Sequence, residues 1–201
     1  MKVVILAGGR GERLRPLTDR VPKPLLMVGK KPFIFHLVEN LRRRGFTEQT
    51  ILAGYLGDKI FEAFLSENPN ISWDVKIESR PLGTAGALKL IENEFKDERF
   101  IVMNGDTWFD FNLWKLIEEH KKNEYLITVA EVNGVDSGVA VIEREALELI
   151  KEGDSLNKDL YPLLEEWKML KRVEVDGEFF DIGDSLKAYK KFREWKDVII
   201  K

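Results

Sequence analysis

The feature that most constrains the fold of this chain is its beginning, where a short apolar run stops at a cluster of glycines. Residues 2–6 (KVVIL) predict a buried strand, and Gly8 and Gly9 predict that the strand breaks into a turn. With Gly11, three glycines in four positions allow the backbone to approach a ligand closely, because no side chain intervenes. Backbone N–H groups exposed in this way suit phosphate oxygens. The loop therefore indicates a nucleotide-binding site.

Several cationic side chains in and after this loop could neutralise bound phosphates: Arg10, Arg13, Arg15 and Lys23. Two better-known phosphate motifs do not fit the loop. A P-loop requires a Gly-Lys-Ser/Thr tripeptide, which the sequence lacks, and a dinucleotide fingerprint requires a third small residue where Leu14 stands. A glycine turn that only ends a strand, with its arginines in solvent, is the alternative that the loop alone leaves open. We expect Arg10 and Arg15 to be solvated.

Strands and helices alternate over the first 122 residues, which predicts parallel strands with helical crossovers. Helices are expected at about 32–45, 58–66 and 83–94, and further strands at 50–54, 73–77 (with Trp73, Val75 and Ile77 alternating) and 100–103. In such a sheet, ligands bind beyond the carboxyl ends of the strands. Both the glycine loop and the Asn104-Gly105-Asp106 turn fall at such ends.

Beyond residue 122 the pattern favours antiparallel strands. Strands at 125–132 and 138–142 are joined by a short turn, and residues 169–181 predict a second hairpin around Asp176-Gly177. Helices are expected at about 143–151, 157–168 and 185–197. Because no linker or repeat interrupts the chain, we expect one domain over residues 1–201. Its expected class is α/β, a Rossmann-like three-layer α/β/α fold with a mostly parallel mixed sheet and an antiparallel C-terminal portion.

The composition excludes several classes of function. A net charge of −3 disfavours a nucleic-acid-binding protein, which would carry a basic excess. The absence of cysteine excludes disulfides and thiolate metal sites, and two histidines are few for a zinc site. No apolar run reaches membrane-spanning length and no charged-then-apolar leader precedes the first strand, so we expect a cytoplasmic protein with no membrane partner.

Four motifs, in order along the chain, resemble those of the sugar-1-phosphate nucleotidyltransferases. They are residues 8–18 (GGRGERLRPLT) followed by Pro22-Lys23-Pro24, residues 78–88 (ESRPLGTAGAL), Asn104-Gly105-Asp106 and Asp181-Ile182-Gly183. Enzymes of that family join a nucleoside triphosphate to a sugar 1-phosphate and release pyrophosphate. Glu12 departs from the pattern, since many members carry threonine there. The short length and the sequences around Pro24 and Asp181 look most like the compact mannose- or heptose-1-phosphate guanylyltransferases.

The resemblance implies a role for each matching residue. It places Asp106 and Asp181 at a catalytic Mg²⁺, and Arg13 and Lys23 at the phosphates. It implies that the nucleotide is bound by Leu6, Ala7, Gly8, Gly9, Gly11, Arg13, Glu78, Pro81, Gly83 and Thr84, and the sugar by Asn104 and Gly138. Mg²⁺ prefers oxygen ligands and retains several waters, so two carboxylates plus substrate phosphates suffice. Read alone, each aspartate could instead be a helix cap or a turn residue.

Other acidic residues and the sugar side leave alternatives open. We expect Asp110 and Asp184 to be helix N-caps. Glu78 could accept hydrogen bonds from guanine or from a pyrimidine. Relatives carry a Glu-Lys-Pro segment before the turn that matches Gly138, whereas Glu131 here leads almost directly into that turn without the Lys and Pro.

The favoured reading is therefore guanylyl transfer from GTP to mannose or heptose 1-phosphate. Uridylyl or thymidylyl transfer to a hexose 1-phosphate is the alternative reaction, and a non-catalytic nucleotide-sugar-binding regulatory subunit is the alternative of another class. Leu14 disfavours a dinucleotide-binding oxidoreductase. Apolar helix positions are equally explained by a core, so they predict no particular oligomeric state.

Overall fold

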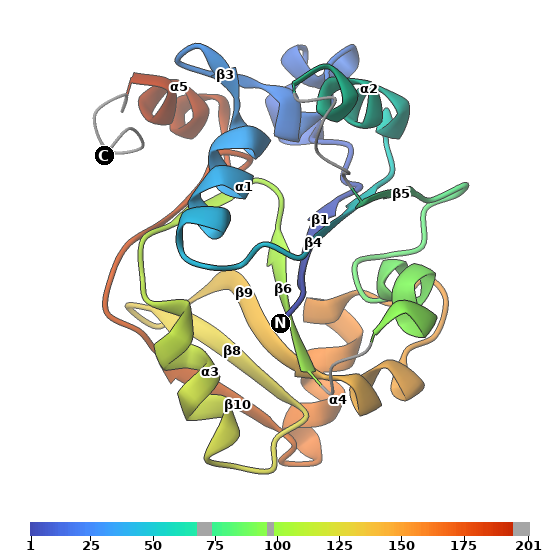
Figure 1. The fold of residues 1–201 in the computed structure, drawn as a ribbon, viewed down its shortest axis with the longest axis vertical. Coiled ribbons are helices and arrows are strands. Elements are labelled where there is room, and N and C mark those ends of the chain that lie inside the picture. The colour runs from blue at the N-terminus through green and yellow to red at the C-terminus, as the bar shows by residue number, and fades with distance from the viewer. Residues whose placement is uncertain (68–73, 96–98, 195–201) are drawn as a thin grey trace.

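The computed structural model describes residues 1–67, 74–95 and 99–194, in which a central β-sheet lies between two layers of helices (Figure 1). Seven strands form the sheet, in the order β10-β8-β9-β6-β1-β4-β5. Their bounds are β1 (Val3–Ala7), β4 (Gln49–Ala53), β5 (Asp74–Ile77), β6 (Arg99–Asn104), β8 (Ile127–Val132), β9 (Val135–Glu143) and β10 (Leu170–Glu174). β1 lies parallel to β4 and β6, β5 lies parallel to β4, and β10 lies parallel to β8, whereas β9 is antiparallel to both of its neighbours. The predicted mostly parallel α/β sheet with an antiparallel C-terminal portion is confirmed.

Alternate side chains of β1 point into two separate hydrophobic cores, one on each face of the sheet. Val3 and Ile5 pack on one face and Val4 on the other, and all three are fully buried. The first face is covered by α1 (Phe33–Arg43), α2 (Gly57–Glu67), α3 (Leu113–Lys121) and α5 (Leu186–Glu194). The second is covered by the 3₁₀ helices η4 (Gly86–Glu94) and η5 (Arg144–Leu149), the π-helix η6 (Leu156–Leu160) and α4 (Tyr161–Glu166). This arrangement is the expected three-layer fold.

The helices at 32–45 and 58–66 are confirmed, and those expected later in the chain differ in type. The left-handed Gly45 ends α1, where the N–H of Phe46 donates to the carbonyl of Leu41. The segment expected as a helix at 83–94 is helical only from Gly86, because the carbonyl of Asp154 accepts the N–H groups of Ala85 and Gly86. Residues 143–151 form only η5, and residues 157–168 are divided between η6 and α4. The expected positions of Trp73, Trp195 and Asp197 lie outside the described residues.

The predicted hairpin at 169–181 is wrong. β10 joins the main sheet, and the N–H of Val175 extends its pairing with β8 by donating to the carbonyl of Glu131. The chain then turns at Gly177, and β11 (Phe179–Asp181) pairs antiparallel with β7 (Thr107–Phe109) in a separate two-stranded sheet. Asp110 fixes this turn, because its Oδ1 accepts the N–H of Glu178 at 2.6 Å. The Asp-Gly pair does turn the chain, but it directs the chain to another strand.

The two predicted N-caps are also wrong. Asn112 caps α3, since its Oδ1 accepts the N–H of Trp114 at 3.0 Å. Ser185 caps α5, since its Oγ accepts the N–H of Ala188 at 3.1 Å. Both caps stand closer to their helices than the aspartates do, which is the position a cap requires.

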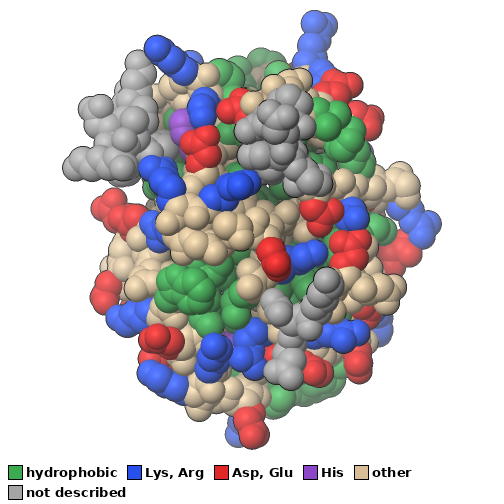
Figure 2. Space-filling model, viewed as in Figure 1, with side chains coloured by type: hydrophobic (Ala, Val, Ile, Leu, Met, Phe, Trp, Pro, Cys, Tyr) green, Lys and Arg blue, Asp and Glu red, His purple; other side chains and the backbone are tan. Residues whose placement is uncertain are grey.

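Three short 3₁₀ helices and a small ribbon complete the fold after the first strand. They are η1 (Glu12–Leu14), η2 (Leu17–Asp19), η3 (Lys23–Leu25), and β2 (Met27–Val28) paired with β3 (Lys31–Pro32). On the face that carries α1 and α3, acidic and basic side chains are interspersed (Figure 2). Among the described helices, none has the length and apolar character required to cross a membrane.

Candidate active site

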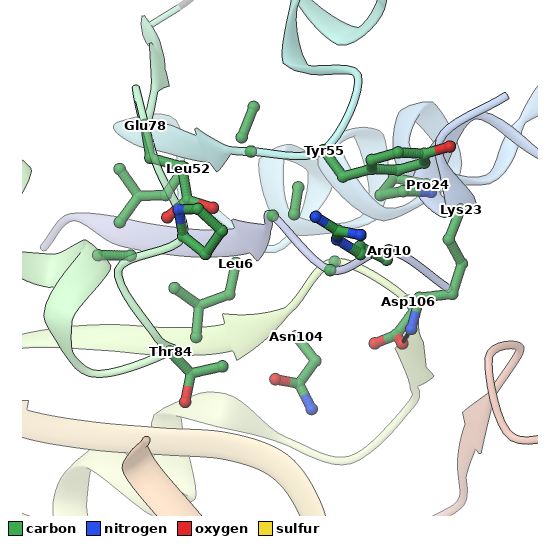
Figure 3. A pocket seen from close by; sticks show the side chains of 18 of the residues that line it. Leu6, Arg10, Lys23, Pro24, Leu52, Tyr55, Glu78, Thr84, Asn104 and Asp106 are labelled. Carbon is green, nitrogen blue, oxygen red and sulfur yellow. Dashed lines mark hydrogen bonds and ion pairs between the residues drawn. The ribbon is translucent and has the colours of Figure 1, made fainter. Parts of the chain in front are cut away.

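A cavity of about 630 Å³ lies at the carboxyl ends of β1, β4 and β6 (Figure 3). Most of the residues that the sequence singled out line it: Leu6, Ala7, Gly8, Gly9, Arg13, Lys23, Glu78, Pro81, Gly83, Thr84, Asn104, Asp106 and Asp181. This is the position at which a parallel α/β sheet binds ligands, because the strand ends and the loops that follow them converge there. Gly11 and Gly138 lie behind the lining, and each has a supporting contact instead.

Gly11 does not line the cavity, but it fixes the conformation of the glycine loop. Its φ of +63° is left-handed, and a Cβ there would lie 2.9 Å from Cγ2 of Thr18. The Thr18 hydroxyl donates to the carbonyl of Gly11 at 2.8 Å. The loop is thus folded back on the segment that follows it, which leaves Gly8 and Gly9 facing the cavity.

Asp106, Asp181 and Lys23 meet at one end of the cavity. Asp106 follows β6 and immediately precedes β7, and the pairing of β7 with β11 sets Asp181 opposite Thr107. The N–H of Ile182 donates to the carbonyl of Asp106 at 3.0 Å, which ties the two aspartate segments together. Lys23 Nζ forms an ion pair with Asp106 Oδ2. The sequence therefore predicted correctly which distant residues share this place.

Gly183 completes this acidic end by having no side chain. A Cβ at Gly183 would lie 2.5 Å from Nζ of Lys23 and 2.7 Å from Oδ2 of Asp106. Its N–H donates to Oδ1 of Asp181 at 2.6 Å. The backbone of Gly183 thus packs directly against the lysine and holds one carboxylate in place.

The electrostatics of this end favour a cation. Burial, together with the nearby charge of Asp106, raises the pKa of Asp181 above its usual range, although the Gly183 N–H and the charges of Lys23 and Arg13 act in the opposite direction. Within the described residues, no group of three or more His, Cys, Asp or Glu side chains is arranged as a metal site. Two carboxylates with an open cavity beside them fit a hard divalent ion that takes its other ligands from phosphates and water.

The three arginines of the loop are all exposed, but only Arg10 and Arg13 line the cavity. Arg13 lines the cavity and pairs with Asp184 at 3.5 Å. Arg15 pairs with Asp19 at 3.4 Å and stays half exposed, as expected. Arg10 is exposed, as expected, and it also lines the cavity. No signal in the sequence separates Arg10 from Arg15, because the direction of each side chain depends on the backbone of the loop.

Glu78 and Thr84 mark the opposite end of the cavity. Glu78 Oε2 accepts the N–H of Leu82 at 3.0 Å, and Oε1 lies so close to Gly54 that a Cβ there would be 2.1 Å away. The Thr84 hydroxyl accepts the N–H of Leu156 at 2.8 Å. Glu78 therefore presents a fixed carboxylate to the cavity, on the opposite side of it from Asp106 (Figure 3).

Asn104, the last residue of β6, meets Gly138, which lies near the start of β9, beside the cavity. Gly138 has a left-handed φ of +72°, and a Cβ there would lie 2.5 Å from the Asn104 amide nitrogen. Asp136 Oδ1 accepts the N–H of Gly138 at 2.7 Å and so fixes this turn. Asp136 belongs to a polar cluster that the sequence did not reveal, in which Arg172 donates to Glu131 at 3.0 Å and Asn157 donates to Asp136 at 3.1 Å.

Comparisons with known proteins agree with this geometry. A family model described as nucleotidyl transferase matches residues 2–152. Mannose-1-phosphate guanyltransferases from Kluyveromyces lactis and Aspergillus oryzae are 29% and 31% identical over 91% of this chain, which spans 61% of the length of these relatives. HddC from Yersinia pseudotuberculosis, also solved in complex with GMP-PN, is 27% identical with a TM-score of 0.82 over 96% of this chain and 98% of that one.

Proposed function

The chain belongs to the nucleotidyl transferase family, and from that premise we propose that it transfers a guanylyl group from GTP to mannose 1-phosphate or heptose 1-phosphate, with release of pyrophosphate. The names of the relatives support guanylyl transfer, as does the GMP-PN that HddC was solved with. The observation that carries the proposal is the meeting of Asp106, Asp181 and Lys23 at one end of a glycine-lined cavity.

The reaction brings two anions together. An oxygen of the sugar phosphate attacks the α-phosphorus of GTP, and the bond from that phosphorus to the bridging oxygen of the β-phosphate breaks, so pyrophosphate leaves. Positioning and charge neutralisation are the protein's main contributions to such a transfer. Asp106 and Asp181 are the residues that would hold Mg²⁺, which supplies positive charge at the phosphates when it is bound.

The other residues that line the cavity are assigned to the phosphates, the base and the sugar phosphate. The backbone of Gly8 and Gly9 borders the phosphates, and Arg13 and Lys23 offset the charge that develops on the leaving group. Glu78 accepts hydrogen bonds from N–H groups of the guanine ring, because its carboxylate already faces the cavity at the end far from the acids. Asn104, supported by Gly138, orients the sugar phosphate.

A pyrophosphate-release screen tests the proposal. Five nucleoside triphosphates are combined with the 1-phosphates of mannose, heptose, glucose and N-acetylglucosamine, with Mg²⁺ present. We expect the fastest release with GTP and mannose or heptose 1-phosphate, and loss of release in Lys23→Ala and Asp106→Ala variants that keep the wild-type circular dichroism. A preference for UTP or dTTP would replace guanylyl by uridylyl or thymidylyl transfer. No release with any pair, together with nucleotide-sugar binding, would favour a regulatory subunit.

Two further expectations belong to this proposal. Residues 1–201 act as one catalytic unit, because the cavity draws on residues from Leu6 to Asp181. We also propose a cytosolic location, which use of a nucleoside triphosphate substrate supports. Expression of residues 1–201 alone, followed by the same screen, tests whether this part of the sequence suffices.

A further inference from the structure

We propose that Arg10 is a further substrate-contacting residue, which binds the β- and γ-phosphates of the nucleoside triphosphate and stays bound to the pyrophosphate that leaves. This inference rests on the proposed nucleotidyl transfer and assigns a role to Arg10, a position of the glycine loop for which the family resemblance implies none.

Arg10 differs from the other cationic side chains of the cavity, because it has no anionic partner among the described residues. Four cations and three anions line the cavity: Arg10, Arg13, Lys23 and Arg80, with Glu78, Asp106 and Asp181. Lys23 pairs with Asp106, Arg13 with Asp184 at 3.5 Å, and Arg80 with Glu152 at 2.8 Å. Within the part of the chain that the structure describes, no ion pair or hydrogen bond is made by the Arg10 guanidinium. Its positive charge is therefore available to a ligand.

The position of Arg10 matches the side on which the leaving group must lie. Figure 3 shows its guanidinium directed into the cavity next to Tyr55, on the other side of the cavity from Asn104. In phosphoryl and nucleotidyl transfer the attacking and leaving oxygens are roughly in line on opposite sides of the phosphorus. If the sugar phosphate approaches from Asn104, the pyrophosphate leaves toward Arg10.

The chemistry of the guanidinium suits this ligand. A planar fork of N–H donors binds two phosphate oxygens at once, whereas a lysine acts as a point charge. Arg10 is solvent-exposed before the substrate binds, so its charge is not stranded in an apolar interior. The loop that carries it is fixed by the left-handed Gly11 and the bond from the Thr18 hydroxyl. The side chain is thus delivered to the cavity by a stable loop.

Direct binding measurements with Arg10→Met test the inference, and Arg15→Met is the matched control. Arg15 lies in the same loop but pairs with Asp19 and does not line the cavity. Calorimetry with Mg²⁺ would give the dissociation constants for GTP, for pyrophosphate and for GDP-mannose, which has no γ-phosphate and no leaving pyrophosphate. We expect Arg10→Met to weaken GTP and pyrophosphate binding by about ten- to hundredfold, the usual size of a charge-assisted contact, and to leave GDP-mannose binding near the wild-type value. The dissociation constants of Arg10→Lys for GTP and pyrophosphate should fall between those of the wild type and of Arg10→Met.

The results separate this inference from the function on which it rests. Wild-type protein that releases pyrophosphate, with an Arg10→Met variant that binds GTP and pyrophosphate as tightly as Arg15→Met does, would overturn the role of Arg10 and leave the enzyme intact. An equal loss for GDP-mannose would also overturn it, because Arg10 would then bind the α- or sugar phosphate. Binding of GTP and pyrophosphate needs no turnover, so the role of Arg10 is decided even if no sugar 1-phosphate reacts.

Discussion

Replacing Gly183 by alanine should impair the chemistry more than the fold. The new Cβ would lie 2.5 Å from Lys23 Nζ, 2.7 Å from Asp106 Oδ2 and 2.8 Å from Lys23 Cδ. Non-bonded contacts of this kind are favourable at about 3.5–4.0 Å, so the lysine and the carboxylate must each move away from the new Cβ by roughly 1 Å. The backbone itself accepts alanine, because Gly183 is not left-handed.

The size of each effect follows from which atoms must move. Overpacking costs about 1–3 kcal/mol in the free energy of unfolding, and because the crowded atoms belong to side chains we expect the lower end of that range. In a chain of this size, each kcal/mol lowers the thermal midpoint by about 2–4 °C. A displacement of 1 Å in groups that position a reaction can reduce turnover about a hundredfold. We therefore expect a small loss of stability and a large loss of pyrophosphate release.

Urea unfolding and the pyrophosphate assay, applied to two backgrounds, measure these effects. In a Lys23→Ala background two of the three contacts are absent, including the closest, so the stability cost of Gly183→Ala should shrink. Gly9→Ala is the control for stability, since nothing lies within 4 Å of its added Cβ. An equal cost in both backgrounds, or near-normal pyrophosphate release by Gly183→Ala, would refute this account of the acidic end.

Three other predictions concern single side chains. Asp181→Asn should raise the free energy of unfolding of the metal-free protein at pH 7 by up to about 1 kcal/mol after allowance for partial exposure, and with it the thermal midpoint, because burial and the charge of Asp106 already raise the pKa of Asp181. The same variant should lose turnover. Asp106→Asn, which breaks an ion pair, should lower the midpoint. Glu78→Gln should raise the KM for GTP about tenfold or more and leave that for UTP less affected, because guanine offers two adjacent N–H donors to the carboxylate and uracil offers one, and the amide keeps only one acceptor oxygen. Burial lowers the pKa of His120 below its ordinary 6.5, so the unfolded chain binds a proton that the native protein does not, and stability should fall as the pH drops below about 6.5.

Each of these three has an outcome that would contradict it. A lower midpoint for Asp181→Asn in EDTA would mean that its charge stabilises the empty site. Equal changes in the KM for GTP and UTP would remove Glu78 from base selection. For the histidine, urea midpoints at pH 7.5 and 5.5 should converge in His120→Gln and remain apart in His36→Gln, the only other histidine variant available; an unchanged difference in His120→Gln would show that other groups titrate.

The parts of the site that follow a strand could be predicted from the sequence. A buried apolar run fixes where a strand ends, and a parallel sheet collects such ends at one edge, so the glycine loop and Asp106 were placed together correctly. Asp181 was assigned through the resemblance, although its strand was placed in the wrong pairing. The position of Asp181 beside the cavity was thus easier to predict than the pairing of the strand that carries it.

The remaining errors have a common physical origin in long-range contacts. The turn at Gly177 has a strong local signal for a hairpin, but the pairing of β10 with β8 and of β11 with β7 outweighs it. Arg10 and Arg15 are the same residue type in the same loop, and only the folded backbone directs one of them into the cavity. Local sequence patterns indicate which secondary structures a segment can adopt, whereas contacts with distant segments decide which of them it adopts in the folded protein.

The small ladder of β7 and β11 has a consequence for how the protein is made. Asp106 immediately precedes one of its strands and Asp181 ends the other, so 75 residues of translation separate the two acids. While the ribosome is still adding those residues, the emerging polypeptide already carries the whole glycine loop and Lys23. The acidic end of the cavity is therefore assembled only after β11 has been made, when Asp181 can be paired beside Asp106.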